Sequence, residues 1–374
     1  MTLTPVPFAS LPGWEGDDHL AAWKAFVASC KPVIDAEKAG NKSGAMRPPP
    51  ALLEVCTLAL ATAASKTSQT RAGARVFFEA HFRPHSVTQS TGADGLLTGY
   101  YEPLVKGSRV ADATYQTPVY KRPADLVNMV AESDRGAKSN AFTHMRQTDK
   151  GLVPYLTRAE IEQGALKGKN LELLYFKDPV DVFFMQVQGS ARIELPDGKQ
   201  VRITYDGKNG YPYTSIGRHL IEAGTFTPDT MSLKALAAWL KADRNRADPV
   251  MWENKSYVFF RELAGTEAEG AMGVLGIALQ AGRSLAVDTA FHAIGTPVYV
   301  AAPSLTHATG KGFARLMIAH DVGSAIKGAE RGDIFFGSGD KAGRTAGVTK
   351  HPGKFFVLVP GGDAIASNAQ GRAP

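Results

Sequence analysis

The amino-acid sequence predicts a mainly β protein that begins with a helical segment. Before Arg83 the apolar side chains recur at helical spacing, whereas from Leu96 onward short apolar runs alternate with turn residues. In the C-terminal third, the runs at 316–319, 334–336 and 355–359 are flanked by glycines, which is typical of buried strands between turns. A chain of 374 residues exceeds one ordinary core, so we expect two domains.

Three helices are expected in the N-terminal segment. The first places Leu20, Trp23 and Phe26 on one face, and Asp17 and Asp18 stand where an N-terminal cap would lie. Consecutive prolines then interrupt the helical pattern. We expect these helices at residues 14–33, 51–65 and 70–81.

The middle of the chain is predicted to mix helices and strands. Thr157, Glu160 and Gly164 form a capping box with a glycine stop, which indicates a helix over 155–164. A Pro-Asp-Gly turn at 196–198 favours a β meander built from 180–188, 191–195 and 201–205. Further helices are expected at 125–129, 213–223 and 232–243, and further strands at 115–122, 254–260, 287–288, 297–300 and 313–318.

Composition and charge narrow the classes of function. The formal net charge is +6 and the pI is about 9.1, which favours anionic partners. The basic residues are scattered without a block of five, so an ordinary basic surface is the simpler interpretation and no nucleic-acid partner is expected. No run of about 18 apolar residues occurs, so no transmembrane segment is expected. The first residues show no signal peptide and no lipid-attachment cysteine.

The sequence lacks the patterns of several enzyme classes. Nine histidines occur without an H-E-x-x-H spacing, and neither a G-x-S-x-G motif nor a phosphate-binding loop is present. The two cysteines, Cys30 and Cys56, are too few for a zinc site and show no C-x-x-C spacing. In an exported protein they would pair and join two helices, and the alternative is two buried free thiols. We therefore expect no metal and no organic cofactor.

A glycine-rich stretch near the C-terminus carries three carboxylates, Asp321, Asp333 and Asp340. So many glycines disfavour a helix, because each costs backbone entropy there, and they favour tight turns. Aspartates at strand ends of a small barrel would point into one shared cleft. His320 adjoins Asp321, but alternation along a strand would direct the two side chains to opposite faces.

This stretch and five upstream motifs resemble the lytic murein transglycosylase A family, whose C-terminal 3D domain is named for three aspartates. The motifs are TGYYEP at 98–103, QVQGS at 186–190, YDGKNG at 205–210, NKSYVFF at 254–260 and LQAGRSLAVD at 279–288. They occur in the order of the family, and the resemblance runs from about residue 92 to residue 358. One motif alone would be weak evidence for the resemblance, but this many motifs in the same order make it specific.

The resemblance implies an architecture and a location. The catalytic domain would be a double-psi β-barrel formed by 1–104 and 246–374, together with the helical segment. Residues 105–245 would form an inserted, smaller β-domain, with a groove for a polymer between the two. The family also implies a monomer in the periplasm or associated with the outer membrane, with peptidoglycan glycan strands as its partner.

The resemblance further implies a reaction. A lytic transglycosylase cleaves the β-1,4 bond between N-acetylmuramic acid and N-acetylglucosamine. One carboxyl protonates the leaving oxygen and then accepts the proton of the muramic C6 hydroxyl, which attacks C1 and gives a 1,6-anhydro product. Two alternatives remain: a water-using glycoside hydrolase of the same fold, and a cell-wall glycan-binding protein without catalysis.

Matching the family motif makes Asp333 the catalytic acid/base, with Asp321 as a supporting catalytic residue. Asp333 precedes an apolar run, so partial desolvation would raise its pKa and retain the proton, whereas the simpler alternative is a turn cap. Arg283 is expected near the aspartates. The residues expected to bind substrate are Thr98, Gly99, Tyr100, Tyr101, Gln186, Gln188, Gly189, Ser190, Asp206, Lys327 and Asp340. For Asp206 to Gly210 a plain turn is the alternative.

Overall fold

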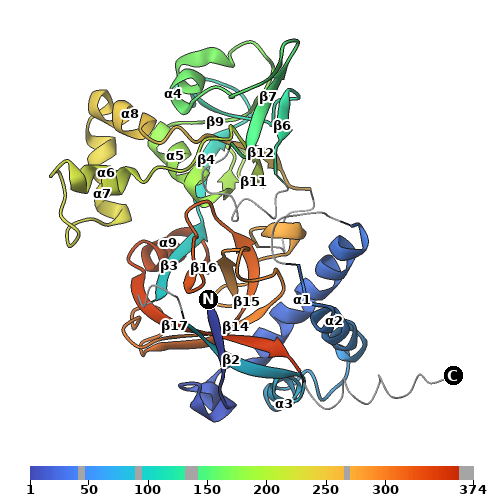
Figure 1. Cartoon of the computed structure of the whole chain (residues 1–374). Coiled ribbons are helices and arrows are strands. Elements are labelled where there is room, and N and C mark those ends of the chain that lie inside the picture. Colours follow the sequence, from blue (N-terminus) through green and yellow to red (C-terminus); the bar gives the residue numbers. More distant parts are fainter. Residues whose placement is uncertain (41–46, 89–94, 131–141, 265–269, 362–374) are drawn as a thin grey trace.

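The structure, a computed structural model, contains two β-sheet units joined by the strand β3, with helices packed on each (Figure 1). It describes residues 1–40, 47–88, 95–130, 142–264 and 270–361. Within these ranges the elements mix helices and strands and are mainly β around the barrel, which confirms the predicted fold class.

The first unit is a closed barrel of six strands. Around the ring, β3 pairs with β17, then β14, β15, β13 and β16 follow in order, and β16 returns to β3. The pairs β13–β15 and β16–β3 are parallel, and the other four pairs are antiparallel. The strands are β3 (Gly95–Glu102), β13 (Ser284–Val287), β14 (Pro297–Ala302), β15 (Phe313–Val322), β16 (Arg331–Ser338) and β17 (Lys350–Pro360).

The barrel interior is apolar because alternate residues of each strand point inward. Buried side chains from all six strands form one cluster that includes Leu97, Leu285, Val298, Met317, Ile334 and Phe355. Short runs of Val, Leu, Ile and Phe therefore predict these strands well, and the structure confirms each C-terminal strand that the sequence predicts.

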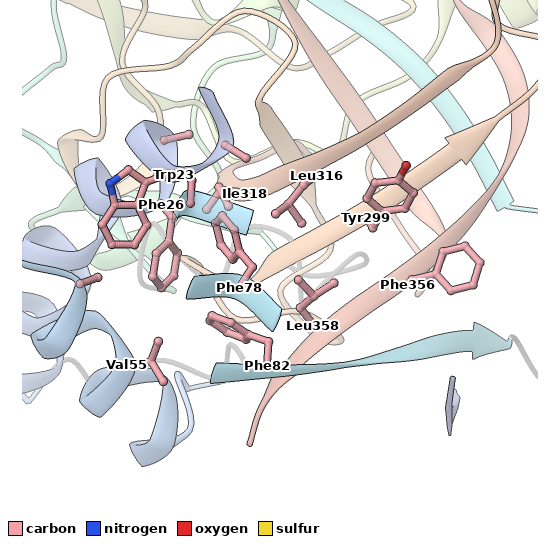
Figure 2. Packing of buried hydrophobic residues seen from close by; sticks show 14 of the residues in the cluster. Trp23, Phe26, Val55, Phe78, Phe82, Tyr299, Leu316, Ile318, Phe356 and Leu358 are labelled. Atoms are coloured by element: carbon pink, nitrogen blue, oxygen red, sulfur yellow. The ribbon is translucent and has the colours of Figure 1, made fainter. Parts of the chain in front are cut away.

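The N-terminal segment packs against the outer side of the barrel. Strand β1 (Thr2–Pro5) pairs with β2 (Phe82–Thr88), which pairs with β17. Three helices cover this sheet: α1 (His19–Lys38), α2 (Pro50–Thr62) and α3 (Arg71–His81). Figure 2 shows Trp23, Phe26 and Phe78 of the helices against Tyr299, Leu316 and Ile318 of the barrel.

All three predicted N-terminal helices are present. The first begins later than predicted because Asp18 is its N-cap, and the Asp18 side chain accepts a hydrogen bond from the Ala21 amide. Residues Trp14–Gly16 form a separate short turn before it. Cys30 of α1 and Cys56 of α2 form a disulfide, so the prediction of pairing is confirmed and the free-thiol alternative is wrong.

The second unit is a six-stranded sheet with the order β12, β11, β10, β4, β9 and β5. These strands are β4 (Leu104–Ser108), β5 (Thr117–Tyr120), β9 (Glu172–Phe176), β10 (Ser190–Glu194), β11 (Gln200–Lys208) and β12 (Val258–Glu262). A smaller sheet contains β6 (Leu126–Asn128), β7 (His144–Thr148) and β8 (Gly151–Val153). Helices α5 (Pro179–Gln188), α6 (Ile216–Glu222), α7 (Leu233–Ala242) and α8 (Arg244–Trp252) pack beside them.

Two predictions in this unit are wrong: the strand at 180–188, which was the first strand of the predicted β meander, and the helix at 125–129. Residues 180–188 form helix α5, because the Asp178 side chain caps the Val180 amide and Pro179 occupies the first helical position. Gly189, at φ +79°, then ends the helix. The short segment predicted as a helix at 125–129 is instead strand β6, which pairs with β7. The strands β10 and β11 and their Pro-Asp-Gly turn are confirmed.

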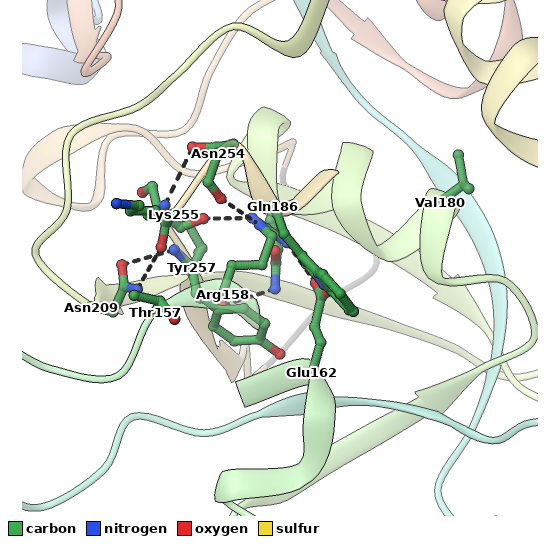
Figure 3. A network of polar contacts seen from close by, with 12 residues as sticks. Thr157, Arg158, Glu162, Val180, Gln186, Asn209, Asn254, Lys255 and Tyr257 are labelled. Carbon is green, nitrogen blue, oxygen red and sulfur yellow. Dashed lines mark hydrogen bonds and ion pairs between the residues drawn. The ribbon is translucent and has the colours of Figure 1, made fainter. Parts of the chain in front are cut away.

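The YDGKNG segment is not the plain turn that was the alternative for Asp206 to Gly210, because strand β11 continues as far as Lys208. A network of polar contacts beside this strand end fixes the neighbouring segment, residues 254–257 (Figure 3). The buried Arg158 guanidinium donates to the carbonyls of Asn254 and Ser256, and Asn209 donates to that of Lys255. This network holds residues 254–257 against the end of β11. The Thr157–Glu160 capping box that precedes it is confirmed.

Among the described residues, no helix combines the length and the apolar character needed to cross a bilayer.

The disulfide gives the first testable expectation. Replacing both cysteines by alanine should lower the free energy of unfolding by about 3 kcal/mol, because the bond closes a loop with a sequence separation of 26 residues. Denaturant unfolding of the double variant measures this. Wild-type protein in strong reductant should unfold at the same midpoint as the variant. Equal midpoints of the oxidised wild type and the variant would contradict the expectation.

Candidate active site

A cavity of about 300 Å³ lies between the barrel and the second sheet. The barrel contributes Tyr100, Ala286, Asp321, Arg331 and Asp333 to its lining. The second unit contributes Gln186, Gln188, Gly189, Ser190, Thr204, Lys208, Tyr213, Ser256, Val258 and Arg261. Two of the three aspartates of the glycine-rich stretch therefore share one cavity with side chains of the QVQGS motif.

Strand register brings the two aspartates together. Ala286 in β13 stands opposite Asp321 of β15 on one side and opposite Asp333 of β16 on the other. Asp333 in turn stands opposite Thr98 of β3. Four neighbouring strands thus place Asp321, Ala286, Asp333 and Thr98 in one row across the barrel wall. Because alanine is small, the residue between the carboxylates leaves space in the cavity.

Asp333 lies in a partly desolvated position. Thr98 Oγ1 donates a hydrogen bond of 2.5 Å to Asp333 Oδ1, and Arg331 Nη2 donates to the same hydroxyl at 2.8 Å. Burial raises the pKa of the Asp333 carboxyl above its usual value, although the charge of Arg331 and the Thr98 hydrogen bond act in the opposite direction. A carboxyl with a raised pKa retains its proton closer to neutral pH, as a general acid requires.

Asp321 has a different environment. The Tyr100 hydroxyl donates to Asp321 Oδ2 at 3.0 Å, and the Val322 amide donates to Oδ1 at 2.9 Å. Both hydrogen bonds hold the Asp321 carboxyl in a fixed orientation at the cavity wall. Burial, followed by the charges of Asp321 and Asp333, raises the pKa of Tyr100 well above 10, so this hydroxyl remains a donor. His320 is buried on the opposite face of β15 with its ring against Ser284, as strand alternation predicts.

The cavity wall formed by the second unit is polar, and hydrogen bonds connect parts of it to the barrel. Gln188 Oε1 accepts a hydrogen bond from the Tyr101 amide at 3.0 Å. Lys208, which is only 4% exposed, donates to Ser324 Oγ of the barrel at 3.2 Å and to the Tyr211 carbonyl at 3.1 Å. Gln186 donates to the Val258 carbonyl at 3.4 Å. The Gln188–Tyr101 and Lys208–Ser324 contacts join the two walls of the cavity, whereas the other two lie within the second unit.

Two further predicted residues of β3 contribute without lining the cavity. Thr98 acts through its hydrogen bond to Asp333. Gly99 packs against the Phe336 ring, where an added Cβ would lie 2.5 Å from a ring carbon, so this position requires glycine. Strand alternation then directs Tyr100 into the cavity and Tyr101 away from it.

Four predicted residues lie outside the cavity. Tyr101 and Asp340 line a separate cavity of about 780 Å³ beside helix α9 (Gly339–Ala346). The Asp206 carboxylate lies 3.8 Å from Arg261, and its carbonyl accepts from Arg122. Lys327 Nζ is buried without a hydrogen-bond partner among the described residues, and burial lowers its pKa.

The expected position of Arg283 near the aspartates is wrong. Its guanidinium forms a buried ion pair with Asp17 at 2.7 Å and donates to the Leu316 carbonyl. Asp17 also accepts from the Leu316 amide, so the pair joins the segment before α1 to β15. Arg283 is therefore part of the packing between the helices and the barrel.

Sequence reasoning missed Lys208, Arg331 and Ala286. Lys208 belongs to the YDGKNG motif, where only Asp206 was singled out. Arg331 is two residues before Asp333, and a period of two predicts the same strand face. No sequence pattern marks Ala286 as a site residue. Only the pairing register of β13 with β15 and β16 shows that it lies between the two aspartates. The described residues contain no group of three or more His, Cys, Asp or Glu side chains suited to a metal ion.

Comparisons with known proteins agree with this geometry. Residues 96–261 match the family described as the MltA specific insert domain, and residues 283–359 match the 3D domain. The membrane-bound lytic murein transglycosylase A of Escherichia coli K12 is 32% identical over 290 residues, which cover 75% of this chain and 71% of that protein. The protein of the same name from Vibrio cholerae is 34% identical over 268 residues, covering 70% of this chain and 65% of that protein.

Solved structures show the same similarity. The crystal structure of a membrane-bound lytic murein transglycosylase from Agrobacterium tumefaciens has a TM-score of 0.83 and 34% identity, with 99% of both chains covered. That of E. coli MltA with bound chitohexaose has a TM-score of 0.65 and 25% identity, covering 96% of this chain and 92% of that chain. The barrel, the shared cavity and these likenesses together show that this chain belongs to the membrane-bound lytic murein transglycosylase A family.

Proposed function

We propose that this protein is a peptidoglycan lytic transglycosylase that cleaves the β-1,4 bond between N-acetylmuramic acid and N-acetylglucosamine. The observation that carries the proposal is the Asp333 carboxyl, which has a raised pKa and lies in a cavity bounded by both units. A solved relative binds chitohexaose, a chain of β-1,4-linked amino sugars, which supports a glycan as ligand. The family names of the relatives support murein as the source of that glycan.

In the proposed mechanism Asp333 is the only acid/base. Its protonated carboxyl donates to the leaving O4 of N-acetylglucosamine as the bond to the muramic C1 breaks. The carboxylate then accepts the proton of the C6 hydroxyl, whose oxygen attacks C1 and closes the 1,6-anhydro ring. The proton returned to Asp333 restores the starting state, so no water is consumed.

The neighbouring residues have separate roles in this proposal. The Thr98 hydroxyl orients Asp333, and Arg331 orients Thr98. The Asp321 carboxylate, held by Tyr100, carries a negative charge that would stabilise positive charge developing at C1. Gln186, Gln188, Gly189 and Ser190 of the second unit would contact sugar hydroxyl and acetamido groups. We propose that residues 105–245 supply most of this opposite wall, together with Ser256, Val258 and Arg261 of the same unit.

The location and assembly follow from the same proposal. The relatives are named membrane-bound, and murein lies in the cell envelope, so we place the protein in the periplasm or at the outer membrane. We also propose that the protein acts as a monomer, as the family resemblance implies.

Replacing Asp333 by asparagine tests the mechanism, because the amide keeps the shape but delivers no proton. We expect turnover of purified sacculi to fall by about 100-fold or more, while the protein still folds and binds glycan. Mass spectrometry of the wild-type products should show 1,6-anhydromuramic ends. Reducing ends instead would indicate a water-using hydrolase, and equal digestion by the variant would remove Asp333 from the mechanism.

The Thr98 hydrogen bond gives a prediction about pH. Thr98→Val removes a bond that favours the ionised Asp333, so the pKa of Asp333 should rise. Because the acid must be protonated, activity falls as pH rises through this pKa. The descending limb of kcat/KM should therefore move to higher pH in Thr98→Val. Thr98→Ser, which keeps the hydroxyl, should retain the wild-type limb, and an unmoved or lowered limb in the valine variant would contradict the assignment.

A further inference from the structure

One face of β3 carries three polar side chains at alternate positions: Thr98, Tyr100 and Glu102. Thr98 donates to Asp333, and Tyr100 donates to Asp321. Glu102 is the last residue of the strand before the chain passes into the second sheet (Figure 1). The strand that orients both cavity aspartates therefore ends in a third carboxylate, to which the reaction described above assigns no role.

Glu102 is completely buried and lies where the two units meet. Its Oε1 is 3.0 Å from Arg202 Nε, and both side chains are at most 4% exposed. Its Oε2 is 3.7 Å from Arg192 Nε and accepts a hydrogen bond of 2.6 Å from Ser338 Oγ. Arg192 and Arg202 stand opposite each other in β10 and β11, whereas Ser338 ends β16. One carboxylate thus joins two strands of the second sheet to the barrel.

Backbone contacts beside Glu102 connect this ion pair to the cavity wall. The Tyr101 amide donates to Gln188, and the Arg192 amide donates to the Pro103 carbonyl at 2.8 Å. Gln188 lines the cavity. A displacement of β10 and β11 relative to β3 would therefore also displace the wall that faces Asp333.

We propose that Glu102 is a positioning residue: its buried ion pair with Arg202 holds the second wall at a fixed place relative to Asp333. This inference rests on the proposed function for its kinetic part alone. A buried charge is costly when unpaired, so the pair strongly favours the arrangement in which both partners meet. Reaction geometry is sensitive at this scale, since a misplacement of about 1 Å can cost as much as 100-fold in rate.

Neutral variants separate positioning from stability. Glu102→Gln leaves a buried guanidinium unpaired and should lower the melting temperature and kcat. The double variant Glu102→Gln/Arg202→Gln leaves no fully buried charge unpaired, because Arg192, the second partner of Glu102, is 32% exposed and reaches water. Its melting temperature should therefore recover much of the loss. Its kcat on glycan strands should nevertheless stay about tenfold or more below wild type. If kcat recovers together with the melting temperature, the role is only structural and the proposal is wrong.

Asp17→Asn is the matched control, because it breaks the buried Asp17–Arg283 pair, which lies within the barrel unit and its helices. It should lower the melting temperature, while kcat at a temperature well below melting stays at the wild-type value. A comparable loss of kcat in this control would show that any lost buried ion pair reduces turnover, and would overturn the proposal.

A distance measurement tests the inference independently of activity. Spin labels at the exposed positions Lys199, in the β10–β11 turn, and Lys354, in β17, report the separation of the two units. We expect a narrow distance distribution in the wild type and a broader or shifted one in the double variant. An unchanged narrow distribution would overturn the proposal. Absence of anhydro products from the wild type would instead reject the proposed function and leave this measurement valid.

Discussion

The structure depends on closure of the barrel by β3. This strand pairs in parallel with β16 and antiparallel with β17, although more than 200 residues separate it from either. The segment between these strands includes the whole second sheet. Closure of the barrel therefore brings the beginning and the end of this inserted segment to the barrel. Loop-closure entropy rises slowly with length, and the apolar interior of the six strands supplies the compensating burial.

Closure also creates the electrostatic asymmetry of the cavity. Asp321 receives hydrogen bonds from the Tyr100 phenol and the Val322 backbone amide. Asp333 receives a bond from the Thr98 hydroxyl, which is itself shared with Arg331, and desolvation prevails over both effects. The two aspartates that flank the same alanine therefore lie in different hydrogen-bonding environments.

The second unit is held to the barrel through polar groups. Around the cavity the contacts between the units are hydrogen bonds and ion pairs, of which Lys208–Ser324, Gln188–Tyr101 and Glu102–Arg202 are examples. Such contacts are directional, and they specify one arrangement more sharply than apolar packing does. In the proposed function, these directional contacts would keep a glycan strand aligned with Asp333.

Several features of this protein depend on local chemistry and can be predicted from the amino-acid sequence. Asp18 and Thr157 cap their helices, the short glycine-bounded runs become barrel strands, and the motif order identifies the family. The local sequence pattern predicted the wrong element at 180–188, because an apolar run of this length fits either a strand or a helix. The N-cap at Asp178 favours the helix that the structure shows. The sequence also left Asp206, Tyr101 and Asp340 among the expected glycan contacts, although the structure places them outside the cavity.

Contacts between residues that are distant in the sequence depend on the folded arrangement of the strands. Register across four strands sets Asp321 and Asp333 on either side of Ala286 and brings Thr98 to Asp333. Strand alternation directs Tyr100 into the cavity and Tyr101 away from it. The packing of the second sheet brings Lys208 and Arg202 to the barrel. These contacts join residues that are far apart in the sequence, and they depend on the pairing register of the strands. A shift of one residue in the register would move every side chain of a strand to the other face of the sheet, and one sequence alone does not specify that register.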